Sequence, residues 1–283
     1  MNTPPPALTE IKVAHSPDSD DAFMFYALAT NKLPTDGLKF SHVLSDIESL
    51  NRRALAGEFE VSAVSFHAYP YLQDKYRLLN HGGSVGYGYG PMIVGSRPFT
   101  VEEVRGKTIA IAGERTTSAL VLKLFAPDVK TEILPFDQII PAIVAGDFEA
   151  GLLIHEGQLT YARSGLHKVI DLGKWWLDET GLPLPLGGNV IRRDIEPALA
   201  RRVSGLLRDS IQYALEHREE ALSYAQQFAR DMESGMADKF VGMYVNERTL
   251  GYGADDKQAI EKILLMGFER GIIPRKPVLD FLD

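Results

Sequence analysis

The sequence predicts an α/β protein of two lobes, each a mostly parallel sheet flanked by helices. Three observations predict this fold. Short apolar runs alternate with amphipathic stretches from residue 11 to about residue 175, which is the pattern of repeated βα units. Two segments rich in glycine and proline, 82–91 and 182–188, interrupt this alternation. The length of 283 residues is sufficient for two lobes.

Apolar runs predict the strands, and the amphipathic stretches between them predict the helices. The predicted strands are 11–14, 38–44, 61–64, 108–112, 133–134 and 150–154. The predicted helical stretches are 22–29, 47–56, 67–73, 117–125 and 139–145. A helix between two strands returns the chain to the starting end of the sheet, so that the strands run parallel.

The pattern becomes helical after Arg193. Asp194 is expected to cap a helix that begins near Ile195, since apolar residues then recur at helical spacing as far as Ala214. Gly271 is expected to end the last helix. The further predicted helices are 219–230, 237–245 and 255–270. We interpret their apolar faces as core packing without a chemical role.

The two interruptions are expected to be crossings between the lobes. Lobe one then comprises residues 1–90 plus 187–283, lobe two comprises residues 91–186, and the ligand cleft lies between them. Two crossings also make a hinge plausible, so ligand binding is expected to close the lobes. The glycines of the first crossing lack the GxGxxG spacing of a nucleotide loop. Tyr87 and Tyr89 between them are expected in the cleft wall, with a plain turn as the alternative.

The composition excludes several classes of protein. A formal net charge of −8 argues against a nucleic-acid partner. The absence of cysteine excludes disulfides, thiolate catalysis and cysteine-based metal sites. No window approaches the ~20 apolar residues of a membrane span, and the first ten residues lack the pattern of a signal peptide. The protein is therefore expected to be cytoplasmic, with no membrane span.

A histidine follows the last apolar run of the central block. Leu152, Leu153 and Ile154 lead directly into His155 and Glu156. Ligand sites of open α/β sheets lie at the carboxyl ends of strands, and an imidazole can take up a proton near neutral pH. His155 is therefore a candidate general base. The alternative is a loop residue or a hydrogen-bonded core histidine.

An acidic segment follows the first predicted strand. His15 and Ser16 precede Asp18, Asp20 and Asp21. Asp18 or Ser19 can cap the next helix, and carboxylates in its first turn complement the helix dipole. The functional alternatives are recognition of ligand hydroxyls or, on weaker grounds, a metal site. His15 is expected to direct a second imidazole toward the same sheet edge.

Hydroxyl side chains follow two further predicted strands. Ser65 follows strand 61–64, and a run of three hydroxyls opens helix 117–125. Hydroxyls together with the free amides of a helix N-terminus form an anion site, whereas helix capping is the structural alternative. All these segments lie at predicted carboxyl ends of strands. The residues expected to bind the substrate around His155 are Ser16, Ser65, Thr116, Thr117 and Ser118.

Several short motifs occur in a distinctive order from about residue 11 to residue 193. They are Ser16-Pro17 before acidic residues and Phe23, Asp46-Ile47-Glu48 with Leu50-Asn51, Gly88-Tyr89-Gly90-Pro91, Thr116-Thr117, Ile154-His155-Glu156 with Thr160-Tyr161, and Trp175-Trp176 before Gly181-Leu182-Pro183-Leu184-Pro185-Leu186-Gly187. In these motifs the chain resembles the 1,4-dihydroxy-6-naphthoate synthase family of the futalosine route to menaquinone.

The resemblance implies a fold and a reaction. The family has the two-lobed fold of type II periplasmic binding proteins. It cleaves cyclic dehypoxanthinyl futalosine, a small aromatic carboxylate, to 1,4-dihydroxy-6-naphthoate and releases a three-carbon fragment. By position, His155 falls on the family's general base, Ser65 within its first substrate-binding segment, and Thr117 with Ser118 on the second. Aromatisation drives this reaction, so no cofactor and no metal is expected.

The chain departs from the family pattern at two sites. Asp18 and Ser19 stand where the family commonly has Cys-Pro, with Asp20 next to them, and Ala63 stands where it can have a lysine. Two alternatives therefore remain: a solute-binding protein without chemistry, and the sister family that dehydrates chorismate in the same pathway. The segment 154–156 favours the synthase.

Overall fold

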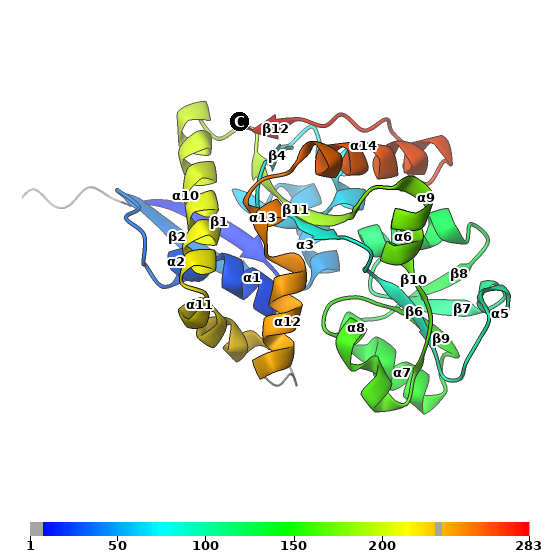
Figure 1. Cartoon of the computed structure of the whole chain (residues 1–283). Coiled ribbons are helices and arrows are strands. Elements are labelled where there is room, and N and C mark those ends of the chain that lie inside the picture. Colours follow the sequence, from blue (N-terminus) through cyan, green and yellow to red (C-terminus); the bar gives the residue numbers. More distant parts are fainter. Residues whose placement is uncertain (1–7, 230–233, 283) are drawn as a thin grey trace, which may run out of the picture.

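The computed structural model describes residues 8–229 and 234–282. Its strands form two separate sheets, each accompanied by helices (Figure 1). Figure 1 shows one sheet with α1, α10 and α12 on the left and the other with α7 and α8 at the lower right. The predicted α/β fold class is therefore confirmed.

The first sheet contains seven strands within the described ranges. They are β1 Thr9–His15, β2 Leu38–Leu44, β3 Val61–Ser65, β4 Tyr76–Leu79, β5 Ser84–Gly86, β11 Leu184–Arg192 and β12 Phe281–Leu282. Their order is β12-β4-β11-β3-β1-β2, and β5 pairs with β11. The pairs of β1 with β2 and β3 are parallel. The long strand β11 runs antiparallel to β3, β4 and β5.

Helices of three segments accompany this sheet. They are α1 Ser19–Met24, α2 Tyr26–Ala29, α3 Ile47–Ala56, α4 Tyr69–Leu72, α10 Pro197–Glu216, α11 Arg218–Ala225, α12 Ser234–Tyr244, α13 Glu247–Leu250 and α14 Ala254–Glu269. One core cluster joins β1, α1, α10 and α11 through buried side chains such as Phe23, Phe25, Val203 and Ile211. The sequence pattern thus identified the apolar face of α10 correctly.

The second sheet has the order β10-β6-β9-β7-β8 among the described residues. Its strands are β6 Met92–Gly95, β7 Thr108–Ile111, β8 Lys130–Ile133, β9 Ala150–Leu153 and β10 His167–Asp171. Its helices are α5 Val101–Arg105, α6 Thr117–Phe125, α7 Ile139–Ala145, α8 Gly157–Thr160 and α9 Leu172–Thr180. β7 pairs parallel with β8 and β9, whereas β6 runs antiparallel to β9 and β10. Both sheets are therefore mixed, because β11 in the first sheet and β6 in the second run antiparallel to their neighbours.

The chain passes between the sheets twice, after β5 and after β10. The glycine- and proline-rich segment 182–188 was expected to interrupt regular structure, but most of it belongs to β11. A register irregularity between Pro185 and Gly187 accommodates the proline, which has no N–H to donate to the ladder. The lobe boundaries at 90/91 and 186/187 stay a prediction.

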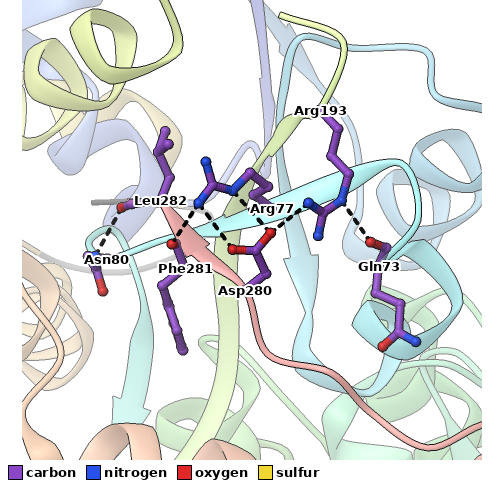
Figure 2. A network of polar contacts seen from close by, with 7 residues as sticks. All are labelled: Gln73, Arg77, Asn80, Arg193, Asp280, Phe281 and Leu282. Carbon is purple, nitrogen blue, oxygen red and sulfur yellow. Dashed lines mark hydrogen bonds and ion pairs between the residues drawn. The ribbon is translucent and has the colours of Figure 1, made fainter. Parts of the chain in front are cut away.

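The C-terminus is fixed to the first sheet by a polar network (Figure 2). Asp280 accepts two hydrogen bonds from Arg77, both 3.1 Å long, and one of 2.6 Å from Arg193. Arg77 also donates to the carbonyl of Phe281, and Asn80 donates to that of Leu282. These contacts hold the short strand β12 parallel to β4, although the sequence pattern predicts no strand there.

The C-terminal helices correct one sequence expectation and confirm another. The cap of α10 is Glu196, whose carboxylate accepts from the amides of Ala198 and Leu199, each at 2.9 Å. Asp194 does not cap this helix, because its carboxylate pairs with Arg192. Gly271 follows α14 with φ +70°, as expected of a C′ glycine. Two sequence predictions lie outside the described residues. They are the absence of a signal-peptide pattern, which concerns residues 1–7 in part, and the end of predicted helix 219–230.

No helix in the described part of the chain is both long and apolar enough to cross a membrane.

Candidate active site

A cavity with about 750 Å³ of open space lies where the ends of the two sheets meet. Ser16 follows β1 and Ser65 ends β3, both in the first sheet. His155 follows β9 in the second sheet, and α6 begins after β7. The six residues expected from the sequence all line this cavity: Ser16, Ser65, Thr116, Thr117, Ser118 and His155.

His155 faces a carboxylate from the other side of the cavity. Its Nδ1 lies 3.0 Å from Oδ2 of Asp18, which precedes α1. The Asp18 side chain is only 3 % exposed, whereas that of His155 is 20 % exposed. His155 also has φ +53°, a left-handed conformation that is uncommon outside glycine. The ring of Phe136 meets the imidazole edge-on, with centroids 5.0 Å apart. The backbone and two neighbours thus orient an imidazole that still reaches the cavity.

Asp18 occupies the N-cap position of α1 but makes no side-chain cap hydrogen bond. The expectation that an aspartate caps this helix is therefore wrong for Asp18, because its carboxylate contacts His155 instead. Glu156 is His155's neighbour in sequence, but it lines a different cavity. The carboxylate that orients the imidazole comes from the other sheet, which no local pattern reveals.

Two other aspartates of this segment, Asp20 and Asp21, line the cavity. Burial raises the pKa of Asp21 to about 6, although the amide of Ser16, which donates to its Oδ2 over 2.7 Å, lowers it. Burial, together with the charges of Asp21 and Asp18, raises the pKa of Asp20 well above its ordinary value. Oδ1 of Asp20 has no hydrogen-bond partner among the described residues. A protonated Asp20 can therefore donate a hydrogen bond to a ligand oxygen.

The Asp18–Asp21 segment was also considered as a metal site. Among the residues that the structure describes, no group of three or more histidine, aspartate or glutamate side chains is arranged to hold a metal ion.

Ser65 is held in place by Asn51 of α3. Asn51 accepts from the Ser65 amide at 2.9 Å and donates through Nδ2 to the Ser65 hydroxyl at 3.1 Å. Ser65 makes no cap hydrogen bond to the helix turn that follows it. Because its hydroxyl oxygen already accepts from Asn51, the hydroxyl hydrogen remains available to a ligand. Asn51 therefore positions a donor toward the cavity.

The three hydroxyls at the start of α6 are engaged with the protein itself. Thr116 caps the helix by accepting from the Ala119 amide and also shares a 2.8 Å hydrogen bond with Ser118. The hydroxyl of Thr117 donates to the carbonyl of Leu186. The helix provides no acceptor for the amides of its first turn, so the N–H groups of Thr117 and Ser118 are the stronger candidates for anion binding.

A second contact crosses the cavity. The hydroxyl of Tyr244 in α12 donates to Oε1 of Gln158 in α8 over 3.0 Å. Gln158, Phe240 and Tyr244 line the cavity as well. Phe240 and Tyr244 of α12 thus pack in a core cluster, as the sequence predicts, and they also line the cavity. Tyr87 and Tyr89 do not line the cavity; the ring of Tyr89 packs against Tyr244 instead.

His15 is directed away from the cavity, contrary to expectation. It is buried, its Nδ1 donates to the Ser16 carbonyl at 2.9 Å, and its Nε2 lies 3.0 Å from Nδ1 of His42. Successive side chains of a strand point to opposite faces, so a position at the strand end does not by itself bring a histidine to the site. Burial lowers the pKa of both His15 and His42 to about 4.

Comparison with known proteins assigns the chain to a family. The model of a family described as menaquinone biosynthesis matches residues 11–269. A 1,4-dihydroxy-6-naphthoate synthase from Thermus thermophilus is 36% identical over 267 residues, which cover 94% of this chain and 97% of the relative. The chain belongs to the 1,4-dihydroxy-6-naphthoate synthase family. A synthase from Streptomyces coelicolor is 34% identical and covers 93% of this chain and 95% of its own.

Solved structures show the same fold. A crystal structure of a protein from Archaeoglobus fulgidus is 45% identical, with a TM-score of 0.90 over 93% of this chain and 98% of that chain. The alkanesulfonate-binding protein SsuA from Xanthomonas axonopodis, bound to MOPS, has a TM-score of 0.74 at 12% identity and covers 96% of this chain and 97% of its own. The fold is therefore that of periplasmic binding proteins, while membership of the synthase family makes this chain a lyase of menaquinone biosynthesis.

Sequence reasoning located the hydroxyls and His155 but missed their supports. Tyr244 gave no signal in the sequence, and Gln158 stood out only as one of the polar residues that follow His155. Asn51 stands out in the sequence only within the motif that follows Asp46-Ile47-Glu48.

Proposed function

We propose that this synthase converts cyclic dehypoxanthinyl futalosine, an aromatic carboxylate, to 1,4-dihydroxy-6-naphthoate and a three-carbon fragment, with His155 as the general base. The observation that carries the proposal is the imidazole of His155, held by Asp18 at one side of a cavity that also presents the Ser65 hydroxyl and the first amides of α6. A base and hydrogen-bond donors facing one enclosed space are what carbon–carbon cleavage with a developing oxyanion requires.

Each group has a distinct part in this proposal. Nδ1 of His155 faces Asp18, so Nε2 is the nitrogen that takes the proton. Nε2 takes the proton of a substrate hydroxyl next to the scissile bond, and the O–H electron pair forms a carbonyl in the departing three-carbon fragment. The carbon–carbon bond breaks at the same time, and its electron pair passes into the ring system and leaves negative charge on a ring oxygen. The hydroxyl of Ser65 and the amides of Thr117 and Ser118 donate to that oxygen. Aromatisation of the product makes the cleavage favourable.

The remaining binding groups act on the substrate before cleavage. Ser16 and the neutral carboxyl of Asp20 line the same cavity and can hydrogen-bond to substrate oxygens, whereas Thr116, also in the lining, fixes the start of α6 through its hydroxyl. We further propose that the chain divides into lobe one, residues 1–90 plus 187–283, and lobe two, residues 91–186. The two lobes close on the substrate. The enzyme works in the cytoplasm.

A product assay tests the function directly. The protein is incubated with cyclic dehypoxanthinyl futalosine, and both products are identified by mass spectrometry. We expect stoichiometric naphthoate and a three-carbon product without added metal or cofactor. Tight substrate binding by calorimetry without turnover would instead indicate a solute-binding protein. Dehydration of chorismate in a parallel assay would indicate the sister activity.

A further inference from the structure

We propose that Asp18 is a positioning residue for His155, and that the two form a carboxylate–imidazole pair completed only when the two sides of the cleft meet. This inference rests on the proposed function, in which His155 is the base. The two residues lie 3.0 Å apart, but they follow strands of different sheets, β1 and β9.

The local structure around Asp18 supports this role. A carboxylate at an N-cap position with extended backbone ordinarily accepts from the first turn of its own helix. Asp18 has this backbone, with φ −100° and ψ 159°, yet makes no such bond. Its own amide donates to the hydroxyl of Ser16 at 3.3 Å, which fixes the turn. The carboxylate is thereby directed across the cleft, and it is almost completely buried against His155.

The pair has a chemical consequence. A carboxylate that accepts from Nδ1–H fixes the imidazole tautomer and leaves the Nε2 lone pair free to take a proton. It also stabilises the imidazolium that forms after the proton is taken. When the sides of the cleft separate, His155 loses this partner. Proton abstraction is therefore coupled to closure, so that the base is complete only around a bound substrate.

Other ionisable groups lie near His155 in space or in sequence. Asp21 interacts with it electrostatically, but its carboxylate is occupied by the Ser16 amide. Asp20 lies beside Asp21 on α1, and Glu156 follows His155 in sequence. Asp18 is the carboxylate for which a hydrogen-bond distance to His155 is observed. Replacing Asp18 thus removes the closest negative charge while leaving the others in place.

Kinetics of D18N and D18A test the proposal. D18N keeps the shape of the side chain, and we expect its kcat to fall at least about tenfold, as when other imidazoles lose their orienting partner, while KM changes less than threefold. The acidic limb of its pH–rate profile should move to lower pH, because the imidazolium loses a neighbouring carboxylate. Formate should restore part of the activity of D18A by occupying the vacated position.

Two control variants distinguish a role of Asp18 in positioning His155 from a role only in holding the two sides of the cleft together. Y244F removes the other hydrogen bond across the cleft, so it should raise KM but should neither shift the pH profile nor respond to formate. H155N should not respond to formate either. If D18N retains the wild-type kcat and pH profile, or if D18A is impaired and formate has no effect, Asp18 does not position the base.

Nitrogen-15 NMR of the histidines gives a readout that does not depend on turnover. H155N identifies the His155 signals, which are recorded with and without 1,4-dihydroxy-6-naphthoate. We expect the Nδ1-protonated form to predominate in the wild type, to increase with the product, and to decline in D18A. Identical His155 signals in wild type and D18A would overturn the pair. A wild-type protein with no turnover would instead overturn the proposed function.

Discussion

The structure contains two contrasting histidine pairs, Asp18 with His155 and His15 with His42. Asp18 lies only three residues after His15 in the sequence, yet the two pairs place histidine in opposite environments. His155 meets the carboxylate of Asp18 and opens onto the large cavity. His15 meets another imidazole, His42, and is buried beside the ring of Phe25, with centroids 4.5 Å apart. The first pair joins the candidate base to a carboxylate, whereas the second joins two imidazoles.

This difference teaches what makes a histidine reactive. In the buried pair, Nδ1 of His15 donates to a carbonyl, so its Nε2 must accept from Nδ1–H of His42. Both rings are then neutral, and protonating either one requires a buried charge with no carboxylate hydrogen-bonded to it. His155 has both a carboxylate and access to ligand. A carboxylate in direct contact and access to the cavity, rather than a position at a strand end, distinguish the candidate base.

The largest expected effect on turnover comes from removing the candidate base. His155→Asn should lower kcat by about 10²-fold or more, the usual contribution of a general base, while substrate affinity changes little. His42→Gln is the matched control, since glutamine can still donate to His15, and its turnover should stay within twofold of wild type. Product assays and calorimetry on both variants measure this. Equal losses in the two variants would show that the comparison is wrong.

A second variant tests the donor that Asn51 positions. Ser65→Ala should reduce kcat by about 10²-fold, as the loss of one oxyanion donor does elsewhere. Ser62 is a buried serine of the same strand that does not line the cavity, and its hydroxyl donates to the carbonyl of Ala63. Ser62→Ala should therefore affect stability more than turnover. A Ser65→Ala enzyme with the wild-type rate would remove Ser65 from oxyanion binding.

Much of this architecture is predictable because its signals are local. Helices α3, α6 and α7 begin and end at the predicted residues. Asp46 caps the first and Thr116 the second, and glycines with positive φ follow α3 and α7. Short-range chemistry of this kind is visible in the sequence.

The contacts that give the site its chemistry are not local. Asp18 and His155 lie far apart in the chain, so their pairing depends on how the two sheets meet. The proline and glycines of β11 indicate a break in structure, but neighbouring strands hold that segment extended. Tertiary contacts overrode the local preference in both cases.

The buried histidine pair should make the protein sensitive to acid. The pKa of His42 is about 4 in the folded protein, because burial and His15 lower it, against 6.5 when unfolded. Below pH 6.5, His42 takes up a proton in the unfolded chain but stays neutral in the folded protein. The contribution of neutral His42 to the free energy of unfolding is therefore complete above pH 6.5 and is lost as the pH falls toward 4. One such group corresponds to about 3 kcal/mol.

Urea unfolding of wild type and His42→Gln at pH 7 and pH 4.5 measures this effect. The wild type should lose more free energy of unfolding than the variant between these pH values. Asp21 acts in the opposite direction, because its raised pKa favours proton uptake by the folded protein below about pH 6. The variant comparison cancels that contribution, since Asp21 is present in both proteins. Equal losses would mean that His42 does not carry a depressed pKa.

The smallest expected effect on turnover concerns Thr117, next to a third buried histidine. The Thr117 hydroxyl donates to the Leu186 carbonyl and accepts from the His67 amide at 3.2 Å. Thr117→Val removes both bonds, which should cost about 1–3 kcal/mol of stability. The backbone amide of residue 117 remains, so turnover should fall less than about tenfold, and less than in Ser65→Ala. Melting curves and the product assay separate these effects, and a larger loss of turnover than in Ser65→Ala would show that the hydroxyl leaves Leu186 to bind the substrate.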